Sequence, residues 1–127
     1  MSEKKAILFV DDDEFVREMY ALKFQKEGFA LEFAHDGVEA LEKVAPGKYQ
    51  LIISDMVMPN TNGFDLLAEL FKREITKTTP VLVLTNLDEA EGKERCMAHG
   101  ATDYVVKAYS TPTEIVEKAK QIITSHT

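Results

Sequence analysis

The sequence predicts an α/β fold in which a five-stranded parallel sheet is wound on both faces by five helices. Three observations predict it. Short apolar runs alternate with stretches of helical periodicity, which is typical of consecutive strand–helix units. The polar residues that end these runs recur at a spacing that fits one strand, one helix and two loops. The chain has 127 residues, so a single domain over residues 1–127 is expected.

The strands are expected at the five apolar runs, residues 6–10, 30–34, 49–54, 81–84 and 103–106. The first and fourth runs are apolar on both faces, as central parallel strands must be. The second and fifth runs mix polar and apolar residues and fit the edges of the sheet. The order 2-1-3-4-5, numbered along the chain, places both at the edges, and helical crossovers make the strands parallel with right-handed connections.

Capping and stop residues predict where the helices begin and end. The first helix is expected from near Asp13 to Gly28. Asp36 and Asp88 each precede a glutamate by three positions, which resembles a capping box for the second and fourth helices. Thr111, followed by a proline and then by a glutamate three positions on, is a stronger start for the fifth helix.

Helical spacing also predicts which residues face the core. The expected core residues of the first and third helices are Phe15, Met19, Leu22, Phe64, Leu67 and Phe71. Gly92 lies inside the fourth helix, which ends at Gly100, and costs about 1 kcal/mol relative to alanine. That helix should therefore be the softest, with Cys96 packed on its inner side.

Composition excludes several classes of function. The net charge is −7, which opposes binding to nucleic acid or to anionic membranes by this chain alone. The one cysteine excludes an internal disulfide and a cysteine-based zinc site. The apolar runs fall far short of the ~18 residues of a membrane helix, and the N-terminus lacks a signal-peptide pattern. A cytoplasmic protein is expected.

Acidic residues follow two strands that flank the point where the strand order reverses, which is where open α/β sheets bind ligands. Asp11, Asp12 and Asp13 follow the first strand, and Asp55 follows the third. Two unit charges ~4 Å apart repel by about 4 kcal/mol at an effective dielectric of 20. Such a cluster needs a cation, and oxygen ligands without cysteine or clustered histidine favour Mg²⁺.

The fourth and fifth strands deliver different groups to the same edge. Thr85 contributes a hydroxyl and Lys107 an ammonium. A carboxylate nucleophile, a metal, a hydroxyl and a lysine are the parts that phosphoryl transfer requires. Each residue alone is more often a cap, a turn residue or a surface lysine, so the prediction depends on their combination.

Four segments together resemble the receiver domain of bacterial two-component response regulators, including the chemotaxis regulators. They are residues 7–13, residues 55–60 with Gly63, Thr85, and residues 104–107. The resemblance covers essentially the whole chain and implies a flavodoxin-like fold with the strand order 2-1-3-4-5. The chemotaxis regulators are known to have this strand order, so the predicted order is not evidence separate from the resemblance.

The resemblance implies a role for each acidic residue. Asp55 matches the residue that accepts the phosphoryl group. Asp12 matches a direct Mg²⁺ ligand, and Asp11 matches a ligand acting through water. The backbone carbonyl of Val57 matches a further metal ligand. The pair Asp11-x-Asp13 leaves open an alternative, an Mg²⁺-dependent phosphohydrolase with an aspartate nucleophile, although 127 residues leave little room for its usual cap domain.

The resemblance also implies a switch. Thr85 and Lys107 match the groups that hold the phosphoryl oxygens, and Tyr104 matches an aromatic residue that turns inward when Thr85 moves. A histidine kinase or phosphotransfer protein would supply the phosphoryl group. The face formed by the fourth helix, residues 103–106 and the fifth helix would then change its partners, among them an output protein or domain, or form a dimer. Beyond Mg²⁺-dependent self-phosphorylation and self-dephosphorylation, no enzymatic activity is expected.

Two residues depart from the family pattern. Ala108 stands where the family usually has a proline after the lysine. A cis bond before a non-proline residue costs about 3–4 kcal/mol, so the bond from Lys107 to Ala108 is expected to be trans, which could alter the direction of Lys107. Asn86 is bulkier than the usual residue and could crowd Asp55. These departures keep open a receiver-like interaction module that is not phosphorylated.

Overall fold

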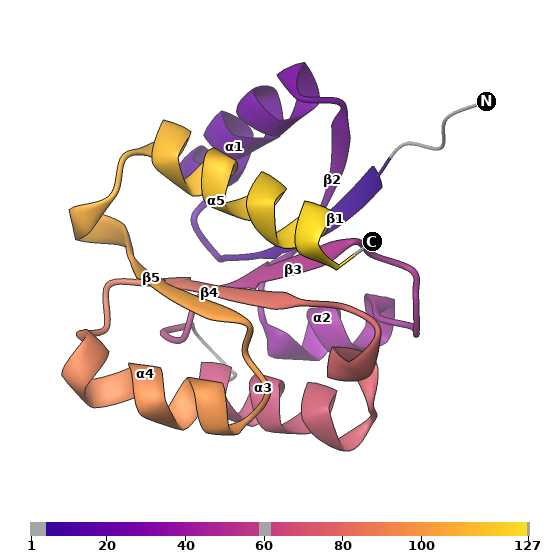
Figure 1. Cartoon of the computed structure of the whole chain (residues 1–127), viewed down its shortest axis with the longest axis vertical. Coiled ribbons are helices and arrows are strands. Elements are labelled where there is room, and N and C mark those ends of the chain that lie inside the picture. The colour runs from indigo at the N-terminus through magenta and orange to yellow at the C-terminus, as the bar shows by residue number, and fades with distance from the viewer. Residues whose placement is uncertain (1–4, 59–61, 127) are drawn as a thin grey trace.

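The strands form one parallel sheet in the order β2-β1-β3-β4-β5 (Figure 1). The computed structural model describes residues 5–58 and 62–126. The strands are β1 Lys5–Val10, β2 Phe29–Ala34, β3 Leu51–Ser54, β4 Val81–Thr85 and β5 Asp103–Val106. The predicted fold class, strand order and edge strands are confirmed. β3 begins later than predicted, because Tyr49 instead packs in the core and donates a hydrogen bond to Glu32 on β2 (2.9 Å).

Five α-helices cover the two faces of the sheet. They are α1 Glu14–Lys26, α2 Gly37–Lys43, α3 Gly63–Lys72, α4 Glu89–Ala98 and α5 Pro112–Ser125, with 3-10 turns at η1 Ile75–Lys77 and η2 Lys107–Tyr109. Figure 1 shows α1 and α5 on one face and α2, α3 and α4 on the other. This is the doubly wound arrangement that the alternation of strands and helices predicts.

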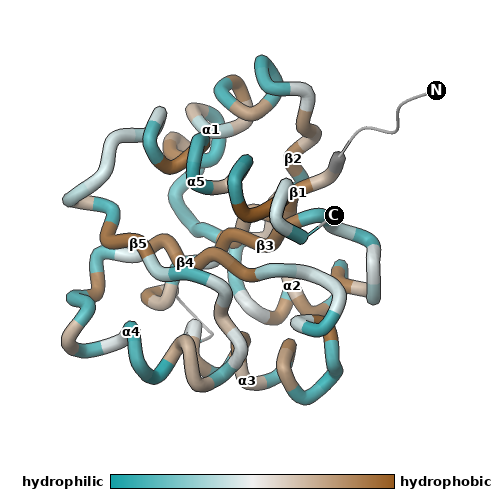
Figure 2. The backbone as a smooth tube through the Cα atoms, viewed as in Figure 1, coloured by the Kyte–Doolittle hydropathy of each residue, from teal (hydrophilic) through white to brown (hydrophobic). Residues whose placement is uncertain are grey.

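Residues of β1 supply both layers of the core. Ile7 and Phe9 pack with the α1 and α5 side, whereas Leu8 and Val10 pack with the α2, α3 and α4 side. Figure 2 shows the hydrophobic strands in the middle of the molecule and hydrophilic segments along the helices. Burial on both faces explains why this strand is continuously apolar rather than alternating.

The predicted core face of α1 is wrong at Phe15 and Leu22, whereas Met19 packs against the core as predicted. Phe15 and Leu22 are 79% and 62% exposed, and the buried residues of this helix are Tyr20 and Phe24. The helix carries apolar residues all along its length, so a choice offset by one position satisfies the same spacing. In α3, Leu67 is buried as predicted, but Phe71 is mostly exposed, and Leu66 and Leu70 complete the buried face.

Helix caps follow the predicted residues, and the capping box of α5 is complete. Asp36 accepts from the backbone N–H of Glu39, and Asp88 accepts from that of Ala90. At α5, the Thr111 hydroxyl accepts from the Glu114 N–H (3.2 Å) while the Glu114 carboxylate accepts from the Thr111 N–H (2.9 Å). The predicted start of α5 is thus confirmed.

Thr111→Ala is expected to lower the free energy of unfolding by about 1 kcal/mol, because the cap to the Glu114 N–H disappears. Urea unfolding monitored by circular dichroism measures the change. Thr113→Ala is the matched control, since Thr113 is an exposed threonine of the same helical turn. Equal losses in the two variants would contradict a specific role for the cap.

Cys96 lies fully inside the core on α4, where its thiol contacts the Met56 sulfur (3.5 Å). Burial raises the pKa of this thiol to about 11, and the place of Cys96 in the core cluster agrees with the predicted packing role. In residues 5–58 and 62–126, no helix combines the length and apolar character needed to cross a membrane.

Candidate functional site

The sheet brings two predicted site residues to one edge. Val10 pairs with Ser54 across β1 and β3, so the next residues, Asp11 and Asp55, leave neighbouring strands at their carboxyl ends. The Asp55 N–H donates to the Val10 carbonyl (3.2 Å), which extends the strand pairing. Both aspartates are buried, with 2% and 8% exposure. They lie where the strand order reverses, as the sequence predicts.

Lys107 joins the two carboxylates. Its ammonium lies 2.9 Å from Asp11 Oδ2 and 2.8 Å from Asp55 Oδ2. The lysine begins the turn η2, and the bond to Ala108 is trans. With this trans bond, the Lys107 side chain still reaches Asp11 and Asp55. Asn86 is exposed at the end of β4.

Opposing effects act on the charge of Lys107. Burial lowers its pKa, but hydrogen bonds and charge attraction from Asp55 and Asp11 outweigh burial, so the net shift of the Lys107 pKa is upward. The buried edge thus stabilises a charged ammonium between the two carboxylates. The positive charge of Lys107 offsets the repulsion expected between the carboxylates of Asp11 and Asp55.

The raised pKa predicts a loss of stability at alkaline pH. Lys107 binds its proton more tightly in the folded state, so its contribution is intact below the unfolded pKa of 10.5 and is lost as pH rises through the higher folded pKa. Above pH 10.5, the unfolding free energy of the wild type should fall more steeply than that of Lys107→Met. Urea titrations on both sides of this pH provide the measurement.

Lys118→Met is the matched control for that titration, because Lys118 forms a half-exposed ion pair with Asp103 (2.9 Å). Exposed pairs contribute little, so this variant should follow the wild type. A Lys107→Met curve parallel to the wild type would contradict the prediction.

The remaining carboxylate oxygens bind the backbone. Asp11 Oδ1 accepts from the Asp13 N–H (2.9 Å), and Asp55 Oδ1 accepts from the Val57 N–H (3.1 Å). Asp13 caps α1, because its carboxylate accepts from two N–H groups of the first turn. Asp12 is exposed. Capping engages Oδ1 of Asp13, the residue that the phosphohydrolase alternative would use as its second acid.

The donor set fits a hard cation. Among residues 5–58 and 62–126, no three His, Cys, Asp or Glu side chains are grouped closely enough to form a metal centre by themselves. Mg²⁺, however, typically uses one or two carboxylates with water and other oxygen ligands. Asp11 and Asp55 supply buried carboxylates, with Asp12 and the Val57 carbonyl beside them in the chain. Pro59 and Asn60 of the predicted motif lie outside the described residues.

Thr85 and Tyr104 hold the same loop residue. The Thr85 hydroxyl is fully buried and accepts from the Leu87 N–H (3.3 Å). The Tyr104 hydroxyl donates to the Leu87 carbonyl (2.7 Å), and burial is the largest cause that raises the pKa of Tyr104 to about 12. Tyr104 is therefore inward, and Leu87 is a connecting residue that the sequence analysis missed.

Two further residues, Ser54 and Tyr20, lie near the site. Ser54 is buried and donates to the Asp55 carbonyl (3.0 Å). The pKa of Tyr20 is raised to about 12, first by burial; Asp11 also raises it, while Lys107 lowers it. Ser54 could be recognised from the sequence because it directly precedes Asp55. Tyr20 can be recognised only once the buried face of α1 is known.

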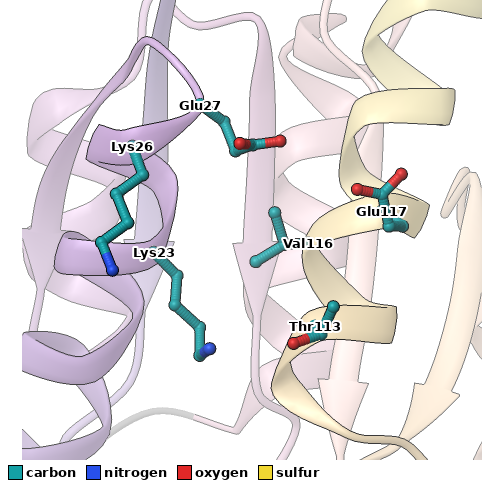
Figure 3. A pocket seen from close by; sticks show the side chains of 6 residues that line it. All are labelled: Lys23, Lys26, Glu27, Thr113, Val116 and Glu117. Atoms are coloured by element: carbon teal, nitrogen blue, oxygen red, sulfur yellow. The ribbon is translucent and has the colours of Figure 1, made fainter.

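A separate groove of about 190 Å³ lies between α1 and α5 (Figure 3). It is lined by Lys23, Lys26, Glu27, Thr113, Val116 and Glu117. These residues include none of the predicted site residues, so the groove is distinct from the edge that carries Asp55.

Comparisons with known proteins agree with the fold and the motifs. The family model of the response regulator receiver domain matches residues 7–120. The transcriptional regulatory protein YkoG of Bacillus subtilis is 35% identical over 120 residues, which are 94% of this chain and 50% of that protein. This chain spans about half the length of the curated relatives it matches.

Solved structures show the same likeness. A Francisella response regulator receiver domain has a TM-score of 0.87 and 31% identity, covering 98% of this chain and 100% of that chain. The response regulator TrrA of Thermotoga maritima, solved in complex with Mg²⁺-BeF, has a TM-score of 0.79 and 34% identity, covering 93% and 98%.

The chain belongs to the response regulator receiver domain family of two-component systems. Members of this family are signalling modules and not classical enzymes.

Proposed function

We propose that the chain is one receiver domain over residues 1–127 whose Asp55 accepts a phosphoryl group in an Mg²⁺-dependent reaction. The observation that carries this proposal is the partly buried Lys107 ammonium held between the buried carboxylates of Asp11 and Asp55. An ammonium at this distance from the acceptor oxygen is placed to neutralise charge on an incoming phosphoryl oxygen.

In the proposed step, a carboxylate oxygen of Asp55 forms a bond to phosphorus while the bond from phosphorus to the donor breaks and the donor keeps its electron pair. The donor is a phosphohistidine or a small acyl phosphate. Asp55 becomes an acyl phosphate, and hydrolysis by water returns the carboxylate. Asp12, Asp11, Asp55 and the Val57 carbonyl would hold Mg²⁺, which when bound would neutralise phosphoryl charge.

The proposed switch follows from the added charge, about −1.5 to −2 with three acceptor oxygens. These oxygens attract the Thr85 hydroxyl and Lys107. Thr85 now binds the Leu87 N–H, so its movement toward the phosphoryl group changes the loop to which Tyr104 is bonded. The face of α4, β5 and α5 then changes its affinity for an output protein or domain or for a second copy. A histidine kinase or phosphotransfer protein in the cytoplasm would be the donor.

Incubation with acetyl phosphate and Mg²⁺, followed by intact mass measurement, tests the proposal. The wild type should gain one phosphate, and Asp55→Asn should gain none. Asp65→Asn is the matched control, because Asp65 is an exposed aspartate of α3, and it should behave as the wild type.

Removal of Mg²⁺ with a chelator should also prevent the gain. Phosphate on the Asp55→Asn variant would overturn the assignment of the acceptor. Sustained turnover of a phosphate ester in that variant would favour a phosphohydrolase, and no gain in the wild type would favour an interaction module that is not phosphorylated.

A further inference from the structure

Gly92 faces the hydroxyl of Tyr104. It is buried on the inner side of α4. A Cβ atom at this position would lie 2.7 Å from Tyr104 Oη and 2.8 Å from Leu87 Cδ2. Both distances are below van der Waals contact, so the inward position of Tyr104 depends on the absence of a side chain at residue 92.

This packing is linked to the proposed phosphorylation site through Leu87. The Leu87 carbonyl accepts from Tyr104 and the Leu87 N–H donates to Thr85. Thr85 ends β4, beside the strand that leads to Asp55. The backbone of one loop residue therefore connects the Gly92 position to the site.

We propose that Gly92 is a positioning residue that holds Tyr104 under α4 before any phosphoryl group is present, so that the loop after β4 is already in its inward arrangement. The proposal rests on the function proposed above. From the sequence, Gly92 is expected only to soften the fourth helix; here it also positions Tyr104.

The consequence is an effect on affinity. When a ligand binds only one of two states, its apparent affinity equals its intrinsic affinity multiplied by the fraction of protein in that state. If the inward state is the one that binds a phosphoryl group, Gly92 increases the affinity of the site without touching the ligand. Coupling between two such positions typically amounts to 5–150-fold.

The test uses Gly92→Ala with beryllium fluoride and Mg²⁺ as the probe of the phosphoryl site. The two nearest atoms to the added methyl group are the ends of the Tyr104 and Leu87 side chains, so outward rotation of Tyr104 with a small shift of the Leu87 side chain can relieve the collisions, and the variant should fold. We expect at least fivefold weaker beryllium fluoride binding. Lys93→Ala is the matched control, because Lys93 is an exposed neighbour on α4, and it should bind as the wild type does.

A second measurement follows Tyr104 directly. In protein labelled with 3-fluorotyrosine, the fluorine signal of Tyr104, assigned with Tyr104→Phe, should be protected from solvent in the unmodified wild type and exposed in Gly92→Ala. In a Tyr104→Ala background the collision with the tyrosine ring is absent, so Gly92→Ala should weaken binding less than it does with Tyr104 present.

An exposed Tyr104 in the unmodified wild type would overturn the proposal, as would unchanged affinity in a folded Gly92→Ala variant. If beryllium fluoride binds to no variant and acetyl phosphate does not modify the wild type, the proposed function fails instead. The fluorine signals then still decide whether Gly92 positions Tyr104.

Discussion

Replacing Gly63 by alanine is expected to lower the free energy of unfolding by about 2–3 kcal/mol and to slow phosphorylation of Asp55. An added Cβ would lie 2.4 Å from Met56 Cα and 2.7 Å from the Asp55 carbonyl oxygen. Both are backbone atoms, so no side chain can rotate away, and overpacking of this kind typically costs 1–3 kcal/mol. The displaced segment carries Asp55 itself, so the reaction with acetyl phosphate should slow as well.

Gly47→Ala is the matched control. Gly47 has a φ of +73° and no atom within 4 Å of an added Cβ, so alanine there adds backbone strain of about 1–2 kcal/mol without a collision. It should leave the rate of phosphorylation unchanged. Urea unfolding and intact mass against time measure both effects, and a fully active Gly63→Ala variant would show that the Met56 backbone can move freely.

Lys107→Met should give the second large effect. Removing one partner of a buried ion pair typically costs 3–5 kcal/mol, but the Lys107 side chain is about one-quarter exposed (24%), so we expect a loss of about 2 kcal/mol at neutral pH. The methionine leaves Asp11 and Asp55 close together without their cation. Added Mg²⁺ should then raise the melting temperature of the variant more than that of the wild type.

Thermal unfolding with increasing Mg²⁺ provides the measurement, and Lys118→Met again serves as the surface control. If Mg²⁺ stabilises the wild type and Lys107→Met equally, the lysine and the metal ion do not compensate for the same negative charge. A variant more stable than the wild type would show that desolvation of the ammonium outweighs its two ion pairs.

The sequence was sufficient for the sheet and for most of the site because both depend on simple rules. Buried parallel strands are continuously apolar, so β1 and β4 were visible as runs. The carboxyl ends of parallel strands meet at one edge, so the sequence alone predicts that Asp11 and Asp55 lie together.

Side-chain choices that depend on packing could not be predicted in the same way. In α1, apolar residues occur on more than one side of the helix, and packing against the sheet decides which are buried. Tyr20 and Phe24 are buried, whereas Phe15 and Leu22 are exposed. The role of Leu87 lies in its backbone N–H and carbonyl, which carry no sequence signal. The direction of Lys107 depends on the turn that follows β5.

The link from Lys107 to Asp11 spans 96 positions of the chain. During synthesis, an unfinished polypeptide that stops short of the fifth strand already contains the acidic cluster, but not the amine that completes it. A nascent chain therefore cannot form this ion pair until Lys107 itself has been synthesised.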